Sequence, residues 1–434
     1  MILRALHPAK LLVLGYLIYA LAGWLLLLLP ICHKQPVSIL DDFFVAISAV
    51  STTGLATIDI GTVYSFFGQL VLLFLVQLGG LGYMTISSFI ILRTTGELTG
   101  IRKKLTASNF SLPNDVLMKE FLHHVIIFTF ICEAIGAVAL SLLFYHAGVV
   151  NPIWNGIFHS VSSFSTAGLS LFNDSFVSFQ FAGWMNAILI TLCVLGSIGF
   201  IVCYDFYKKW AGEKDHLFFT TKIILWATSA FLLVGSTLFF FLETPPPGAT
   251  IFDRWIAALF QIVTATTTTG YNTLDIGSLS SSLLLLLLFC SLFGASPAGT
   301  GGGLKNTTFI ALLGLVKSIV QMRKSIFFWK HEIPWKRVRI ATASSIFYGF
   351  ILFPILFLLT LFEKGPFLPI FFEAVSALNN LGLSMGLTSN LTFSGKILIS
   401  LLMLIGRTGV LTFGIAISGK KSTEGLKQAS DLAL

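Results

Sequence analysis

The chain has 434 residues, of which 55% are hydrophobic and only 11% are charged, whereas a soluble domain carries about 25% charged residues. This composition excludes a soluble globular enzyme and indicates a polytopic membrane protein. The formal net charge of +8 comes from basic residues in short loops, a pattern typical of membrane sorting rather than of a nucleic-acid interface. The eight His and five Cys residues show no catalytic, zinc or disulfide spacing, so we expect no enzyme activity and no protein-bound cofactor.

From the N-terminus onward, one order of parts repeats four times: an apolar span, a short half-apolar helix, a loop and a second span. The units cover residues 1–110, 111–212, 213–330 and 331–434, with first spans near 11–31, 121–148, 217–242 and 340–362. The short helices are predicted at Asp42–Ser51, Pro152–Phe164, Asp253–Thr266 and Pro369–Leu378. At about 10–14 residues, they cover roughly half of a bilayer core, so we expect re-entrant pore helices. The sequence thus predicts an all-α membrane protein with eight transmembrane helices, in pseudo-fourfold arrangement around one pore.

Each short helix leads into a segment of small polar residues that ends in glycine and an apolar or aromatic residue. The glycines are 114, 102 and 112 residues apart, and four such segments in register make four ordinary helix ends improbable. Irregular backbone is tolerated in a membrane only where it is buried in protein or lines a wet cavity. Potassium channels present backbone carbonyls to a cation in this way, and the inward C-terminal ends of the half-helices favour a positive charge. The predicted ion-binding residues are Thr52, Thr53, Gly54, Leu55, Thr166, Ala167, Gly168, Leu169, Thr268, Thr269, Gly270, Tyr271, Asn380, Leu381, Gly382 and Leu383.

The fourth of these segments departs from the pattern, because Asn379 and Asn380 stand where the others have Ser or Thr. Its side-chain oxygens therefore differ, and the degree of selectivity for potassium over sodium stays open. Among the outer acids, Asp41, Asp42, Asp59 and Asp275 are candidates for concentrating cations at the pore mouth, although solvated loop acids are the plainer interpretation.

The second span of the third unit is interrupted after Phe293 by the decapeptide 294–303, in which six residues are Gly or Pro. A continuous helix is implausible there. A phosphate-binding loop is excluded because Leu304 separates the glycines from Lys305 and no Ser or Thr follows the lysine. With Arg407, this broken span resembles the gate region of the Trk/Ktr/HKT superfamily of potassium transporters, and the resemblance implies a gate formed by Ala298, Gly299, Thr300, Gly301, Gly302, Gly303, Lys305 and Arg407.

Arg407 and Glu133 fall inside predicted spans, where charges are costly and functional roles are common. Arg407 takes the place that Gly80, Ser197 and Ala295 hold in the other units. It is either an electrostatic barrier in the ion path or a bridge that joins helices. Glu133, in a first span, is either a site residue or a structural hydrogen-bonding group.

The four glycine segments and the broken third-unit span resemble the Trk/Ktr/HKT superfamily of potassium transporters, most closely the bacterial Ktr-type membrane subunit. The resemblance implies potassium uptake through a gated, channel-like filter, with potassium bound at the filter residues only. An alternating-access secondary cation transporter remains the alternative, and sodium dependence remains open. The family resemblance also implies a homodimer that binds a cytoplasmic ring of nucleotide-binding regulatory subunits. The basic loops Arg102–Lys104 and Arg323–Arg339 are available for binding this ring.

Orientation follows from the basic residues, of which 21 of 27 lie in one alternate set of segments. The positive-inside rule places that set in the cytoplasm. We therefore expect a multi-pass protein of the plasma or inner membrane, surrounded by lipid, with both termini cytoplasmic.

Overall fold

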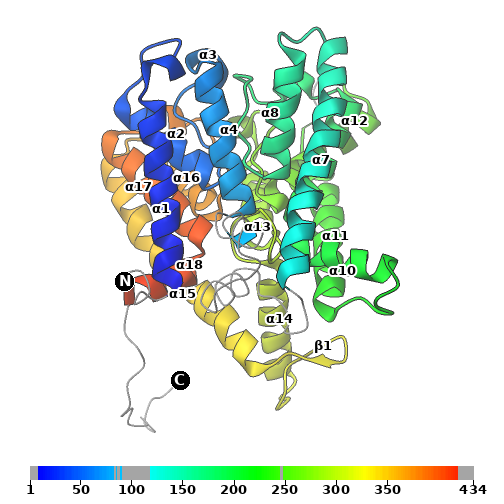
Figure 1. Ribbon diagram of the computed structural model, residues 1–434. Coiled ribbons are helices and arrows are strands. Elements are labelled where there is room, and N and C mark those ends of the chain that lie inside the picture. The colour runs from blue at the N-terminus through cyan, green and yellow to red at the C-terminus, as the bar shows by residue number, and fades with distance from the viewer. Residues whose placement is uncertain (1–7, 83–84, 86–87, 90–117, 245–247, 419–434) are drawn as a thin grey trace.

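The computed structural model describes residues 8–82, 85, 88–89, 118–244 and 248–418, and this part of the chain is predominantly helical. A long helix begins each of the four units (Figure 1). These helices are α1 (Pro8–Leu27), α7 (Met118–His146), α11 (Phe219–Leu242) and α15 (Trp335–Phe362). Each is long and apolar enough to cross a membrane. Among the described residues, strands occur only in the hairpin of β1 (Phe327–Phe328) and β2 (His331–Glu332).

A short, buried helix follows each long one. These pore helices are α2 (Ile39–Val50), α8 (Pro152–Phe164), α12 (Ile251–Thr267) and α16 (Phe367–Asn379). Three of them, α2, α12 and α16, start two or three residues before the predicted positions. Ser38 caps α2, while Thr250 and Asp253 form a capping box on α12. Hydroxyl caps satisfy backbone N–H groups that a helix start leaves free, which explains the earlier start of α2 and α12.

The second half of each unit is not one continuous helix. In units 2 and 4 it bends by 90° and 97° between two helices, and in unit 3 the broken region separates two helices. In unit 1, α4 ends at a glycine cap, Gly82. The segments are α4 (Phe66–Leu81), α9 (Gly183–Ser197) with α10 (Phe200–Trp210), α13 (Ser281–Phe293) with α14 (Asn306–Val320), and α17 (Phe393–Thr408) with α18 (Val410–Ser418).

These bends have a local cause. Gly82, Gly199 and Gly409 have φ angles of 76°, 98° and 83°, which L residues with a β-carbon rarely adopt. We predicted a break in the third unit only, but a glycine ends the helix at the corresponding place in the others. Counting each bent pair as one span raises the number of candidate spans in the described residues from four to six.

The four units pack head to tail around a common centre. The second helix of each unit lies against the pore helix of the next: α4 against α8, α9 against α12, α13 against α16, and α17 against α2. The last pairing returns from unit 4 to unit 1 and closes the ring. This closure brings the four glycine segments together at the middle of the molecule.

The outer surface suits a lipid environment, since large apolar side chains such as Ile18, Phe353 and Phe357 are exposed. Charged elements mark the two ends. The short helix α3 (Ile60–Val63), capped by Asp59, lies at the upper end in Figure 1, and the lysine-bearing α10 and the hairpin lie at the lower end.

Candidate functional site

The four glycine segments share one backbone conformation. The residue two positions before each glycine has φ near +50° (Thr52 51°, Thr166 50°, Thr268 56°, Asn380 52°), and the glycines Gly54, Gly168, Gly270 and Gly382 have φ of 95°, 63°, 87° and 86°. The backbone N–H of the residue that precedes each glycine donates to the carbonyl of the residue five positions before it, at 2.8–2.9 Å in all four units. Positive φ at two nearby positions reorients successive carbonyls, as a carbonyl-lined ion path requires.

Each of these four glycines, which we call filter glycines after the role predicted for them, lies against a backbone carbonyl of the next unit. A β-carbon on any of the four would lie closer than 3.0 Å to that oxygen. The pairs are Gly54 with Ala167, Gly168 with Thr269, Gly270 with Leu381, and Gly382 with Thr53. The contacts therefore run from unit 1 through unit 4 and back, and they hold four carbonyls in a ring that only glycine permits.

The side chains of the filter residues mostly brace the segments. Asn380 Nδ2 donates to Thr53 Oγ1 and to the carbonyl of Met403, both at 2.8 Å, so its polar group joins unit 4 to unit 1. The residues after the glycines, Leu55, Leu169, Tyr271 and Leu383, are buried. The carbonyls of Leu169 and Leu383 accept hydrogen bonds from Ser162 Oγ at 2.9 Å and Ser376 Oγ at 2.7 Å.

Above the ring lies an outer cavity of about 360 Å³, which all four filter glycines line. Of the four acids predicted at the mouth, Asp59 lines this cavity, and Asp275 caps a short turn by accepting from Gly277 N at 3.0 Å. Asp41 pairs with Lys396 at 2.6 Å. Burial opposes ionisation of Asp41, but the hydrogen bonds from Lys396 and Thr57 outweigh it and hold the pKa of that carboxyl below its usual range.

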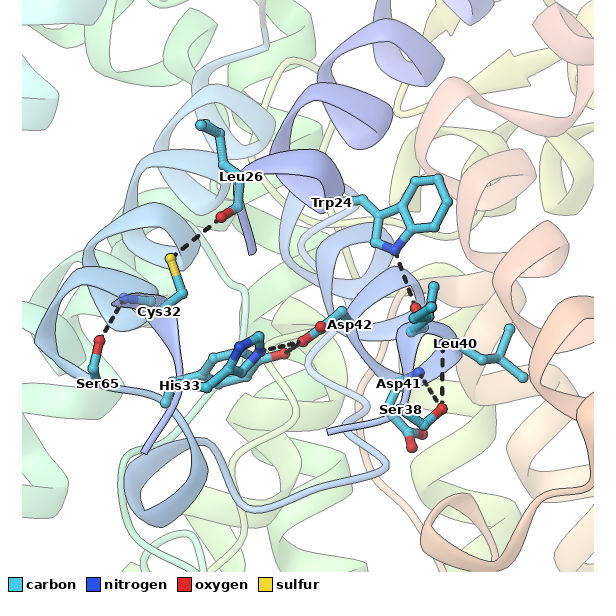
Figure 2. A network of polar contacts seen from close by, with 12 residues as sticks. Trp24, Leu26, Cys32, His33, Ser38, Leu40, Asp41, Asp42 and Ser65 are labelled. Atoms are coloured by element: carbon cyan, nitrogen blue, oxygen red, sulfur yellow. Dashed lines mark hydrogen bonds and ion pairs between the residues drawn. The ribbon is translucent and has the colours of Figure 1, made fainter. Parts of the chain in front are cut away.

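Asp42 is not a mouth residue, contrary to the interpretation of the outer acids as a group. It is buried, and it accepts from Tyr64 Oη at 2.7 Å and lies 3.0 Å from His33 Nε2. Figure 2 shows this carboxylate pointing toward the His33 ring, away from the Ser38 cap of the same helix. Asp42 therefore ties the loop after α1 to the pore helix.

The glycine loop 294–303 passes directly beneath the filter. Gly302 N donates to Thr268 Oγ1 at 2.7 Å, and Thr300 Oγ1 lies 3.1 Å from Thr166 Oγ1. Thr300 N also donates to the carbonyl of Gly196 at 3.1 Å. A β-carbon on Gly299, Gly301 or Gly302 would lie closer than 3.0 Å to a carbonyl oxygen of the surrounding helices and filter. The loop is therefore packed against the inner side of the ring.

Two cationic side chains hold this loop. Lys305 Nζ donates back to the carbonyls of Gly301 and Gly302 at 2.6 and 3.1 Å. Arg407 donates through Nη1 to the carbonyl of Thr300, and through Nη2 to the carbonyls of Gly79 and Gly80. Both line an inner cavity of about 440 Å³ together with Ala298, Gly299 and Gly303. Arg407 thus lines the inner cavity and joins three units, as the bridging interpretation predicted, while its role as an electrostatic barrier stays a prediction.

Glu133 lies away from the ion path. Its Oε2 accepts from Gln77 Nε2 at 3.1 Å, which joins α7 of unit 2 to α4 of unit 1. This contact agrees with the interpretation of Glu133 as a structural hydrogen-bonding group.

Our reading of the sequence missed a further set of residues behind the filter. A hydroxyl residue stands six positions before every filter glycine: Ser48, Ser162, Thr264 and Ser376. Aligning the four units on their glycines exposes this regularity, because a residue at that distance in a pore helix faces the loop that the helix leads into.

Taken together, the fold and the site define a polytopic membrane transport protein, in which four similar units meet at a common centre. The comparisons with known proteins agree. The TrkH family, described as "Cation transport protein", matches residues 20–424, so the chain belongs to this family.

Individual relatives and a solved structure extend this result. The chain is 33% identical to Ktr system potassium uptake protein B of Vibrio alginolyticus, with 95% of this chain and 92% of that one covered. It is 34% identical to the protein of the same name from Bacillus subtilis (94% and 92% covered), and 29% identical to the potassium/sodium uptake protein NtpJ of Enterococcus hirae (98% and 96%). The crystal structure of the potassium transporter TrkH from Vibrio parahaemolyticus has the same fold, with a TM-score of 0.71 at 23% identity over 93% of this chain and 83% of that one.

Proposed function

We propose that this protein takes up potassium across the cytoplasmic membrane through a gated pore, with the four predicted units as its pore units. The observation that carries the proposal is the closed ring of four carbonyls, each seated against the filter glycine of the neighbouring unit. A ring of fixed carbonyl dipoles replaces the hydration shell of a monovalent cation. The pore helices end at this ring, and the negative ends of their dipoles add to its attraction for a cation.

The glycine loop and its two cations are the gate of this pathway. The loop lies under the ring, and Lys305 and Arg407 place two positive charges on the wall of the inner cavity. Like charges repel more strongly as the effective dielectric falls, so a potassium ion meets a barrier there. Displacing the loop and Arg407 together would open the path, because each is hydrogen bonded to the other.

The orientation and partners of the protein form part of the same proposal. The end with the filter mouth faces outward, while the end with α10 and the hairpin faces the cytoplasm, together with both termini. The basic segment Arg323–Arg339 is available there for a regulatory ring of nucleotide-binding subunits on a homodimer. The other predicted docking loop, Arg102–Lys104, lies outside the described residues. Sodium dependence is a further proposal, supported by the name of the Enterococcus hirae relative.

The test uses filter glycine Gly270 and a matched control, Gly365. Nothing lies within 4 Å of a β-carbon built on Gly365, whereas Gly270 has a φ of +87° and faces the carbonyl of Leu381. Uptake of rubidium, as the tracer for potassium, and uptake of sodium are measured in a potassium-uptake-deficient strain. Rubidium uptake is also measured without sodium in the medium, to test sodium dependence. We expect Gly270→Ser to lower the potassium-to-sodium uptake ratio about tenfold or more, corresponding to a loss of about 1.4 kcal/mol in discrimination, and Gly365→Ser to match the parent. An unchanged ratio in a well-assembled Gly270→Ser protein would reject the filter and favour alternating access.

A further inference from the structure

A buried polar side chain stands nine residues before the filter glycine in three of the four units. These residues are His159, Gln261 and Glu373, and each is at most 1% exposed. In unit 1 the same position is Val45. Burying a polar group without a partner costs free energy, so the partners of these side chains indicate what they do.

Glu373, on α16, is bonded to the chain that leaves the filter of its own unit. Its Oε1 accepts from Ser384 Oγ, and its Oε2 accepts from Thr388 Oγ1 at 2.9 Å. The backbone amides of Met385 and Leu387 add further donors. Several donors therefore converge on one buried carboxyl group. It connects the pore helix to the stretch of chain that follows the filter glycine, which we call the outward leg of the filter segment.

His159, on α8, makes the corresponding connection in unit 2. Its Nδ1 lies 2.8 Å from the carbonyl oxygen of Asn155, which can only accept, so Nδ1 carries the proton. Nε2 is then an acceptor: the N–H of Leu171 donates to it at 3.3 Å, and Ser170 Oγ lies at 3.1 Å. This arrangement fixes the tautomer of the ring and makes the Ser170 hydroxyl a donor.

Units 3 and 1 reach the same segment by different means. In the amide orientation that satisfies its hydrogen bonds, Gln261 Oε1 accepts from the backbone N–H groups of Thr273 at 2.8 Å and Leu274 at 3.1 Å. In unit 1, Asp41 in the first turn of α2 accepts from Thr57 Oγ1 at 2.6 Å. Every pore helix therefore presents a hydrogen-bond acceptor to the outward leg of its own filter segment, although the four residue types differ.

The donors and the acceptors stand in different places relative to the ion path. The hydroxyl residues Thr57, Ser170, Ser384 and Thr388 line the outer cavity, whereas His159, Gln261 and Glu373 lie behind its wall. The oxygens of Ser170 and Ser384 also accept from the backbone N–H groups of Phe172 at 3.0 Å and Gly386 at 2.9 Å. Each of these hydroxyls therefore connects a buried acceptor on the pore helix to the backbone at the wall of the outer cavity.

We propose that Asp41, His159, Gln261 and Glu373 are positioning residues for ion selection. They hold the outward leg of each filter segment in place, and three of them do so through hydroxyls that line the mouth. This inference rests on the proposed filter and adds determinants that lie outside it. Glu373 has the largest effect, because it accepts from two hydroxyl groups in the unit whose filter segment lacks Ser and Thr.

The experiment removes the same contact from both sides. Ser384→Ala, Glu373→Gln and the double variant are compared with Ser389→Ala, which removes an exposed mouth hydroxyl whose described bond is to the carbonyl of Gly386 at 3.4 Å. For each protein, the KM for potassium, the maximal rate and the potassium-to-sodium uptake ratio are measured, together with the amount of folded protein in the membrane.

We expect Ser384→Ala to raise the KM for potassium about fivefold to tenfold and to lower the uptake ratio, since a buried hydrogen bond is lost. The maximal rate per folded molecule should stay near that of the parent, and Ser389→Ala should behave like the parent. The double variant should be no worse than Glu373→Gln alone, because residues that share one contact are not additive. A merely structural role would lower the amount of folded protein without changing KM.

Equal effects of Ser384→Ala and Ser389→Ala, or additive effects in the double variant, would overturn the proposal. If Glu373→Gln does not accumulate, Ser384→Ala and Thr388→Val decide the question by the same criteria. Gly382→Ser is measured in the same series to separate the two proposals. Lost selectivity in Gly382→Ser with an unchanged Ser384→Ala leaves the filter standing and rejects the positioning role, whereas two unchanged proteins reject both.

Discussion

Replacing Arg407 with alanine removes three hydrogen bonds that hold the glycine loop beneath the filter. The acceptors are the carbonyls of Thr300, Gly79 and Gly80, so the guanidinium connects the loop of unit 3 with the end of α4 in unit 1. Since the arginine belongs to unit 4, one side chain stabilises the observed position of the loop by joining three units. The loss should therefore favour a displaced loop.

The size of the effect follows from these contacts. Hydrogen bonds to a charged group contribute about 1.5–3 kcal/mol each. Arg407 is only partly buried and borders the inner cavity, so water replaces much of what is lost, and we take about 2 kcal/mol as the net for all three. That value shifts the equilibrium between obstructed and open loops roughly 30-fold. The charge barrier to a passing cation falls at the same time.

The assay is the maximal rate of rubidium uptake per assembled molecule. We expect Arg407→Ala to exceed the parent severalfold. Arg407→Lys should lie between the two, because an ammonium keeps the charge but lacks the planar fork that spans two carbonyls. Arg254→Ala is the matched control, since Arg254 also donates to a backbone carbonyl, that of Phe240 at 3.1 Å, at a site that does not line the inner cavity. A well-assembled Arg407→Ala protein with the parent rate would refute this reasoning, and a poorly assembled one would make Arg407 a structural bridge.

Two further perturbations test the gate and the outer end. Deleting Ala298 to Gly302 should raise potassium flux and reduce its dependence on any cytoplasmic partner, because this stretch packs under the ring; unchanged flux in a folded deletion protein would make the loop a spacer. Lys396→Met should lower the thermal stability of the purified protein at neutral pH, since it removes the ion pair with Asp41. The folded-state pKa of Asp41 lies below its usual value, so the pair stabilises the fold above that usual value and loses its effect as the pH falls through the folded-state pKa. The difference in melting temperature between parent and Lys396→Met should therefore shrink on acidification, and a difference that persists at the acid end would contradict the role of this pair.

The local chemistry of the sequence by itself determined that this is a membrane protein and that it consists of four similar units. Continuous apolar stretches predict membrane spans because polar backbone must be satisfied inside hydrocarbon, and the four glycines in register predict the filter because only glycine tolerates the required backbone angles. The decapeptide 294–303 predicts a broken helix for the same reason. These inferences need only neighbouring residues, so they were accessible before any fold was known.

Tertiary structure decided which distant groups meet. That Gly382 seats against the carbonyl of Thr53, or that Arg407 reaches Gly79, depends on the closure of unit 4 onto unit 1, and no local pattern specifies a contact across more than 300 residues. The same holds for the acids: Asp41 and Asp42 are neighbours in sequence, yet one pairs with Lys396 across two units while the other is buried against His33 and Tyr64. Successive residues of a helix point in directions about 100° apart, so the packing around α2 decides the partner, the burial and the role of each carboxylate.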